Sequence, residues 1–555
     1  MKKLLMLILF LTSCTIAQTA IGVDLNNIYM PINRYGVLAD VNVGPQGSLG
    51  RYPGPTGKGF LFSGGFFLSG YSDTTLWANG VYTSGNVEDF LAGPVGSDPD
   101  DENNIIYTVL ESDTPFGESW QNWSNAVEQG AYFYDGDGNG IYDPVDHNGN
   151  GAWDADEDKP DILYDGTYFT VYNDSKPADE RRFTEVEPLG IEIRQTIFAS
   201  NQNSVLDDVL FVRYSLVYIG TNNPNEPDSL TEVFFSVYTD SDIGATAASA
   251  GDDKVACDTL LQSGYTYNDG EDDDWGINPP AIFKTIVQGP LVKSDDANSI
   301  GYNKMGSAIG ETVFNGYKNL KMTTFTSPQK SAGMVQEPKN QFQVNNYQVG
   351  QDDLGNEIDP CSFAFGEVRG DLDCSQVNNK YWFSGDPVTD YGWIYKPTSD
   401  IRDMVTTGSF TLKKNEPMDI IVAYVVGQGT DALNSIDRAR EITQYVHDEY
   451  DRNFSTIVSV DNEHKEVVNE FSLSQNYPNP FNPTSKIKYQ IAKLGKVELK
   501  VYDILGREIT TLVNDIKAPG IYEVTFNASQ LASGVYFYRL ISSDFVQTKK
   551  MMVIK

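Results

Sequence analysis

The chain has 555 residues, of which 40% are apolar, 12% aromatic and 21% charged, and its net charge is −37 at pH 7. The length and composition are those of a folded protein with more than one domain. The acidity argues against nucleic acid as a partner and is compatible with divalent cations. With 32 Tyr, 49 Gly and few segments of helical periodicity, we expect a mainly β fold.

Residues 1–17 predict an export signal. Lys2 and Lys3 precede an apolar stretch at 4–11, and mostly small residues follow. Cleavage after Ala17 would leave a soluble chain, whereas residues 11–14 also fit a lipobox, in which Cys14 would become a lipidated N-terminus. The apolar stretch is too short to anchor the chain in a bilayer, and no later stretch reaches the length of a transmembrane helix.

The body of the chain, residues 18–454, contains a segment with the spacing of calcium loops, DGDGNGIYDPVDHNGNGAWDADE at 135–157. Such loops place oxygen ligands at positions 1, 3, 5, 9 and 12, a backbone carbonyl at 7 and Gly at 6. Two registers fit, and Asp146 ends the first and begins the second. The predicted Ca²⁺ ligands are Asp135, Asp137, Asn139, Ile141, Asp143, Asp146, Asn148, Asn150, Ala152, Asp154 and Glu157.

The sequences that flank this segment, AYFY and KPDILYDG, lack helical patterns, which argues against paired-helix EF-hands. The segment resembles the calcium loops of thrombospondin type 3 repeats, and the resemblance implies that neighbouring ions share a carboxylate, here Asp146. Seven carboxylates in so short a stretch repel one another unless a cation neutralises them. The alternative is a solvated acidic turn without metal.

Alternating patterns predict strands in the body, which we expect to form one large or two abutting antiparallel β-sandwich units. The clearest strand patterns lie at 165–172, 191–199, 210–219, 233–238, 409–413 and 420–426. Asp240 and Asp242, with Asp252 and Asp253 close behind, form a second, less specific candidate cation site, for which a solvated loop is the simpler explanation.

Three cysteines lie beyond the export signal. Cys361 and Cys374 flank a short polar segment, and an exported chain can keep a disulfide, so we expect them to pair. Two unpaired thiols are the alternative. Cys257 then has no partner, and we expect it to be buried.

Catalytic motifs are absent: the chain has three histidines, none placed convincingly for general-base chemistry, and neither HExxH nor GxSxG occurs. Paired carboxylates can hydrolyse polysaccharides without histidine, so a hydrolase stays an alternative. Aromatic side chains could instead bind a sugar, or they could fill the core of a sandwich. They are Tyr381, Trp382, Phe383, Tyr391, Trp393 and Tyr395.

A helix at 436–454 and a polar linker at 455–470 precede a tail of different charge. Residues 471–555 hold eleven Lys or Arg against six Asp or Glu, so the preceding 470 residues hold 29 basic and 71 acidic residues. This change marks a domain boundary. Alternating patterns in the tail predict a small β-sandwich with strands at 486–491, 497–504, 522–527, 535–541 and 545–554.

The tail contains QNYPNPFNPTSKIKY, then KVYDILGREI, then ASGVYFYRL. These motifs, in this order, resemble the type A C-terminal sorting domain of the type IX secretion system. The resemblance implies an Ig-like sandwich at 471–555, the type IX secretion machinery as a partner, and transport across both membranes of a Bacteroidota-like bacterium. The alternative is an ordinary Ig-like domain with a similar opening.

Two body segments, LFVRYSLVYIG and YWFSGDPVTDYGW, resemble uncharacterised secreted proteins that carry the same tail, which implies a location and no activity. We therefore predict a secreted or cell-surface, calcium-binding β protein with a structural, adhesive or ligand-binding role. A surface polysaccharide or another protein is the expected ligand, and association with the outer-membrane surface is compatible with the tail. A secreted polysaccharide hydrolase is the alternative.

Overall fold

The structure is a computed structural model, and the parts of the chain that it describes form two compact units, Met1–Thr456 and Ile457–Lys555. The predicted export signal at 1–17 and nearly all of the predicted linker lie outside these parts. The described residues are 19–81, 89–202, 204–244, 251–330, 335–397, 400–455, 471–491, 495–517, 520–529, 531–542 and 545–554.

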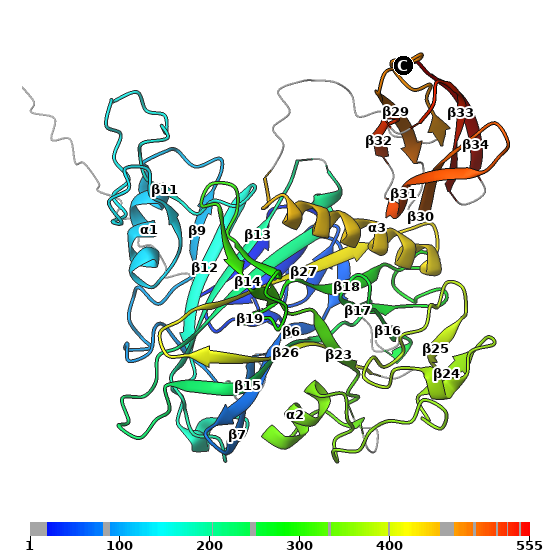
Figure 1. Ribbon diagram of the computed structural model, residues 1–555. Helices are drawn as coiled ribbons and strands as arrows, with labels where there is room; N and C mark the ends of the chain where they lie inside the picture. Colours follow the sequence, from blue (N-terminus) through cyan, green and yellow to red (C-terminus); the bar gives the residue numbers. More distant parts are fainter. Residues whose placement is uncertain are drawn as a thin grey trace, which may run out of the picture. The chain divides into compact units, whose positions relative to one another are not determined.

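The first unit, here called the body, is built on two antiparallel sheets that enclose a common hydrophobic core (Figure 1). Aromatic side chains of both sheets meet in this core: the rings of Phe66 and Tyr214 lie 5.3 Å apart, centroid to centroid, and those of Tyr214 and Phe235 also lie 5.3 Å apart. Burial of such large apolar side chains from two sheets is the main source of stability in a β-sandwich.

The first sheet has ten strands, with the central order β23-β26-β15-β6-β3-β2-β4-β5. Its strands are β1 (Ala20–Asp24), β2 (Tyr29–Asn33), β3 (Leu38–Ala39), β4 (Gly50–Tyr52), β5 (Lys58–Leu61), β6 (Ser63–Ser72), β7 (Thr75–Val81), β15 (Ser229–Asp240), β23 (Met322–Thr326) and β26 (Asp403–Lys413).

The second sheet has nine strands, with the central order β16-β17-β18-β27-β14-β13-β12-β8. Its strands are β8 (Leu91–Ala92), β9 (Tyr107–Leu110), β12 (Gly166–Asn173), β13 (Ile191–Ala199), β14 (Val209–Tyr218), β16 (Lys254–Asp258), β17 (Ser263–Tyr267), β18 (Ala281–Gln288) and β27 (Met418–Gly427). The mainly β, antiparallel sandwich expected from the sequence is confirmed, and all six strand patterns singled out there fall within strands or overlap them.

Helix α3 (Ala432–Asp451) covers the outer face of the second sheet (Figure 1). It begins at Asp431, whose side chain accepts a hydrogen bond from the Asn434 backbone N–H at 2.9 Å, an N-cap that satisfies one free donor of the first turn. Its buried residues include Ile436, Ala439 and Ile442, spaced three residues apart, so one stripe of the helix faces the sheet. The predicted helix is therefore present and begins four residues earlier than expected.

The body also contains shorter helices and two-stranded sheets. The other helices are α1 (Glu118–Glu128), α2 (Gln341–Gln348) and the short 3₁₀ turns η1 (Ala178–Glu180), η2 (Val205–Asp208) and η5 (Cys374–Gln376). Four two-stranded antiparallel sheets in the described part of the body pair β10 (Phe133–Tyr134) with β11 (Lys159–Pro160), β19 (Leu291–Lys293) with β22 (Tyr317–Asn319), β20 (Ile300–Lys304) with β21 (Glu311–Asn315), and β24 (Gly366–Arg369) with β25 (Gly392–Tyr395).

Cys361 and Cys374 form a disulfide, as the sequence predicts for an exported chain. Cys257 is unpaired and buried, which is also as predicted. None of the helices in the described part of the chain combines the length and the apolar character needed to cross a bilayer.

The second unit is a seven-stranded β domain with its own core. One sheet has the order β28-β29-β32, from β28 (Ser472–Leu473), β29 (Thr484–Ile491) and β32 (Gly520–Asn527). The other has the order β31-β30-β33-β34, from β30 (Gly495–Tyr502), β31 (Glu508–Lys517), β33 (Gly534–Ser542) and β34 (Phe545–Val553). All five strands predicted for the tail are present, and β28 and β31 were not foreseen.

Candidate metal-binding loops

The predicted calcium segment is the long loop of a hairpin between β10 and β11. These strands pair Phe133 with Pro160 and Tyr134 with Lys159, so the segment leaves and returns at neighbouring points. In the middle of the loop the buried side chain of Tyr142 donates a hydrogen bond from its hydroxyl to the backbone carbonyl of Trp120 on α1, at 2.9 Å. The polar loop is therefore fixed to a small apolar cluster of the body.

The first half of the loop is wound around the carboxylate of Asp135. Its Oδ1 accepts hydrogen bonds from the backbone N–H groups of Gly138 and Asn139 at 2.8 and 3.1 Å, and its Oδ2 accepts one from Gly140 at 2.9 Å. Gly138 and Gly140 have φ of 74° and 77°, a left-handed conformation that Gly adopts without steric cost. The Gly that the calcium motif requires at position 6, Gly140, is thus also the residue that this backbone conformation favours.

The second half repeats this arrangement eleven residues later around Asp146. Its Oδ1 accepts from Gly149 and Asn150 at 2.7 and 3.2 Å, and its Oδ2 accepts from Gly151 at 2.8 Å. Gly149 and Gly151 have φ of 72° and 74°. The Gly151 N–H, with the neighbouring N–H groups, holds the pKa of the Asp146 carboxyl below its usual value, because these donors stabilise the charged form.

A separate carboxylate closes each half. Asp158 accepts hydrogen bonds from the backbone N–H groups of Gly136 and Asp143, at 3.0 and 2.9 Å. Glu157 accepts the equivalent bonds from His147 and Asp154, at 2.7 and 2.9 Å. Each pair of donors consists of the second and ninth residues of its own loop, so Asp158 belongs to the loop that begins at Asp135 and Glu157 to the loop that begins at Asp146.

The closing carboxylates are buried: Glu157 is 1% exposed and Asp158 2% exposed. Neither forms an ion pair with Lys or Arg in the described part of the chain. Buried carboxylates are normally paired with a positive charge or bound to a metal, since desolvation of an isolated negative charge is costly. Both carboxylates lie beside turns whose side chains carry oxygen acceptors. A bound cation would supply the positive charge that the two carboxylates lack.

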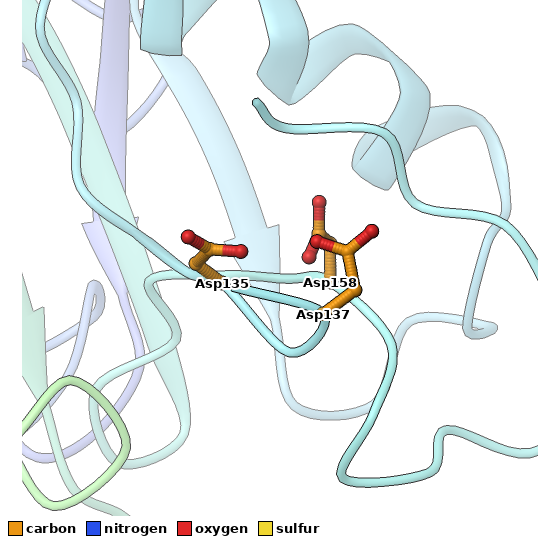
Figure 2. A group of neighbouring side chains, drawn as sticks. All are labelled: Asp135, Asp137 and Asp158. Carbon is orange, nitrogen blue, oxygen red and sulfur yellow. The ribbon is translucent and has the colours of Figure 1, made fainter. Parts of the chain in front are cut away.

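Asp158 also completes a group of three carboxylates with Asp135 and Asp137, whose oxygen atoms lie within 4.8 Å of one another. Figure 2 shows the three carboxylates projecting to the same side of the hairpin loop. Oxygen ligands from several carboxylates are what a hard cation such as Ca²⁺ prefers. This group could hold a metal ion, and the chemistry of its donors fits Ca²⁺.

The structure brings only part of the predicted ligand set together. The carboxylates of Asp135 and Asp137 lie together, but the third member of their group is Asp158, which the motif does not include. Asp146 accepts hydrogen bonds from the backbone of its own loop. Ile141 is 66% exposed. The remaining predicted ligands lie along the two turns at the positions that the two registers give them, namely Asn139, Asp143, Asn148, Asn150, Ala152, Asp154 and Glu157.

A second acidic group lies at the end of β15, where the sequence suggests a weaker cation site. Asp240, Asp242 and Asp400 have carboxylate oxygens within 4.8 Å of one another. Arg402 already supplies a positive charge, because its Nη1 lies 2.8 Å from Asp240 Oδ1 and also pairs with Asp400. Burial raises the pKa of Asp240 well above its usual value and that of Asp242 to about 6.

A cavity of about 700 Å³ opens where the two-stranded sheets β19–β22 and β20–β21 meet the ends of β15, β26 and β27. It combines carboxylates with aromatic rings. The residues that line it include Glu232, Glu416 and Asp419 among the acids and Tyr302, Phe314 and Tyr317 among the aromatic side chains. This mixture of stacking surfaces and carboxylates is typical of sites for polar organic ligands.

Most of the aromatic residues that the sequence suggested for sugar binding lie in the interior. Trp382, Phe383, Trp393 and Tyr395 are at most 1% exposed and pack against one another around Phe363. The interpretation that they fill the core is therefore the correct one for these four. Tyr391 differs, because 49% of it is exposed.

Comparison with known proteins gives one strong result, in the second unit. Residues 475–555 match a family described as a secretion system C-terminal sorting domain. No curated protein matches the chain. Among solved structures, a polysaccharide lyase is similar at 9% sequence identity and a TM-score of 0.26, over 96% of this chain and 47% of that enzyme. The chain thus spans about half the length of the lyase, and so low a score says nothing about a shared activity.

The sequence resemblance and the family match agree on the same strands of the second unit. The chain therefore carries a type IX secretion C-terminal sorting domain, which indicates export to the cell surface or the extracellular space.

Proposed function

We propose that this protein is a secreted or cell-surface calcium-binding protein, in which the hairpin loop between β10 and β11 holds Ca²⁺ and the body serves a structural, adhesive or ligand-binding role. The observation that carries the proposal is the position of Asp158 beside Asp135 and Asp137. A buried carboxylate placed against two others is unfavourable on its own and becomes favourable when a divalent cation binds.

The duplication of the loop supports the proposal. Two halves, eleven residues apart, use the same backbone donors around Asp135 and Asp146, and each is closed by its own buried acid. Weak affinity would suffice outside the cell, where extracellular calcium modules work at about 10⁻⁴–10⁻³ M. Because the loop is fastened to α1 through Tyr142, ion binding is expected to stabilise the body as well as the loop.

Thermal unfolding with millimolar Ca²⁺ and with excess chelator tests the proposal. If free Ca²⁺ exceeds the dissociation constant a hundredfold, each site adds about 2.7 kcal/mol to the free energy of unfolding, so chelation should lower the melting temperature clearly. The double variant Glu157→Gln, Asp158→Asn is the matched control, and its melting temperature should no longer respond to Ca²⁺. Equal melting temperatures of the wild type in both buffers would exclude a calcium role for these loops.

The cavity favours a second candidate, a secreted enzyme that hydrolyses polysaccharide through paired carboxylates. Its support is the presence of Glu232, Glu416 and Asp419 beside Tyr302 and Tyr317. A panel of soluble polysaccharides, assayed for release of reducing ends, separates the two candidates. Turnover that is abolished by Glu232→Gln or Glu416→Gln would establish the enzyme, whereas binding without turnover, weakened by Tyr317→Ala, would favour a ligand-binding role.

A further inference from the structure

Lys284 is a fully buried lysine in the core of the body. It lies on β18, between Ile282 and Ile286, and these three alternate residues face the space between the two sheets. Its side chain is 0% exposed, and its Nζ forms an ion pair with Oδ2 of Asp403, whose side chain is 1% exposed. Asp403 begins β26, in the opposite sheet, so the pair connects the two layers of the sandwich.

Neighbouring hydroxyl groups hold both partners in place. The Thr239 hydroxyl donates to Asp403 Oδ1 at 2.5 Å, and the Thr266 hydroxyl donates to Oδ2 at 3.0 Å. The lysine Nζ itself donates to the hydroxyl oxygens of Thr266 and Ser241, at 3.1 and 3.2 Å. The amine and the carboxyl group are thus held in contact, with little freedom to separate.

Burial acts on the protonation of the amine. Burial lowers the pKa of Lys284, because a low-dielectric interior disfavours the ammonium ion. Replacement of a buried ion pair by neutral groups often increases stability, since the desolvation cost of two charges disappears. A neutral amine beside a carboxyl group is also a nucleophile beside an acyl carbon.

A second buried carboxyl group, Asp253, stands close enough for its charge to act on Lys284. It is 1% exposed, its Oδ2 accepts a hydrogen bond from the Ile243 N–H at 3.1 Å, and its Oδ1 has no donor in the described part of the chain. Burial raises the pKa of Asp253 well above its usual value, which favours its protonated form. In its protonated form, Asp253 can supply a proton to the ion pair.

We propose that Lys284 and Asp403 condense into an intramolecular isopeptide bond that joins the two sheets covalently. A bond forms between Lys284 Nζ and Asp403 Cγ, and the bond from Cγ to Oδ2 breaks. The ion pair first neutralises itself, as one ammonium proton passes from Nζ to Asp403 Oδ2. The departing hydroxyl group then takes a second proton from Asp253 and leaves as water. A second proton from the nitrogen restores Asp253, so atoms and charge balance without an oxidant or a co-reactant.

The geometry supplies what this step requires. Reacting groups that are held in contact behave as if they were at very high concentration, which can replace an external catalyst. Asp403 Oδ1 would remain as the amide oxygen, and the Thr239 hydroxyl that donates to it would stabilise the negative charge that develops on it during the attack.

Peptide mapping of the folded wild-type chain tests the proposal directly. After complete trypsin digestion, the bond would join residues 255–293 to Asp403–Lys413, because a modified Lys284 resists cleavage, and the product would be lighter than the sum of the two peptides by one water, about 18 Da. We expect this cross-linked species in place of separate peptides 255–284 and Asp403–Lys413. Detection of only the separate peptides would overturn the proposal and leave the pair as an ion pair.

Two variants add independent checks. Lys284→Arg keeps a positive charge and should abolish the cross-link. Asp253→Asn keeps the size and the buried position but cannot donate a carboxyl proton, so the cross-linked fraction of freshly folded protein should form more slowly. An unchanged rate in Asp253→Asn would exclude the role assigned to Asp253. The same mass shift in Lys284→Arg would place the cross-link elsewhere and overturn the proposal.

Discussion

Glu157 and Asp158 are adjacent in the chain, yet they close different loops: Glu157 binds the backbone around Asp146, and Asp158 binds the backbone around Asp135. The short segment just before β11 thus supplies one buried acid to each half of the hairpin. Both candidate ion sites depend on this segment, and each depends on a different residue of it.

Single substitutions should therefore remove one site at a time. Asp158→Asn should abolish the site at Asp135 and Asp137, and Glu157→Gln the site at Asp146, because each takes away a negative charge that only one loop uses. Isothermal titration with Ca²⁺ should give two bound ions for the wild type and one for each variant. Loss of both ions in either variant would show that the loops are not independent.

Asp146→Ala distinguishes independent loops from a shared ligand. If Asp146 serves only its own loop, as its hydrogen bonds to Gly149 and Gly151 suggest, one ion should be lost in the titration. If it bridges two ions, as the thrombospondin-like spacing predicts, both sites should weaken together.

Arg213 and Asp161 form a buried ion pair whose disruption should be costly. Arg213 Nη2 lies 2.6 Å from Asp161 Oδ2, and each side chain is 2% exposed. Asp161→Asn should lower the free energy of unfolding by about 3–5 kcal/mol, because it leaves the guanidinium buried without its counter-charge. Urea denaturation measures the loss. The double variant Asp161→Leu, Arg213→Met removes both charges and should recover much of it; a single variant as stable as the wild type would contradict the assignment.

Asp242 should make stability depend on pH. Burial raises its pKa to about 6 from an ordinary value of 3.8. Because the folded state holds this proton more tightly than the unfolded chain, the contribution to stability is complete below pH 3.8 and is lost as the pH rises through about 6. Asp242→Asn should therefore flatten the free energy of unfolding between about pH 4 and pH 7.

The control for this pH profile is Asp295→Asn, a substitution of an exposed carboxylate of the same body. Its profile should follow that of the wild type. A profile of Asp242→Asn that also follows the wild type would show that Asp242 does not titrate in this range.

Deletion of residues 471–555 should stop surface delivery and leave the body in the periplasm, since the sorting domain lies within the deleted part. Immunoblots of periplasmic, surface and culture fractions would follow the body. A chain with the tail intact and the double substitution Glu157→Gln, Asp158→Asn serves as a control for folding defects. Normal delivery of the deleted chain would contradict the sorting role.

Local patterns in the sequence were enough to predict the fold class, several long strands and the last helix of the body. Alternation of apolar residues located β13 at its observed bounds, and the helix predicted at 436–454 overlaps α3. Strand β31 was missed because it is an edge strand with several exposed residues, such as Ile509 and Thr511, so its alternation is weak. Which strands share a sheet was beyond local patterns.

The candidate site shows the same limit. The spacing around Asp135 and Asp146 is local, and it predicted both turns. The motif did not predict Asp158, because this residue is at position 13 counted from Asp146 and the motif ends at position 12. Its role in the first loop follows only from the pairing of β10 with β11. The Lys284–Asp403 contact joins two sheets, so it cannot be predicted from the spacing of neighbouring residues.

The strand order also bears on how the polypeptide travels. The last two strands of the body, β26 and β27, lie inside the sheets: β26 pairs with β15 and β23, and β27 pairs with β14 and β18. A chain that emerges from the ribosome or a translocon with its N-terminus first cannot complete the first sheet until residue 413 has followed, or the second sheet until residue 427 has followed. The strand order thus delays complete folding of the body. For most of its synthesis the polypeptide lacks strands that its two sheets need, so it can still pass through a narrow pore in an unfolded form.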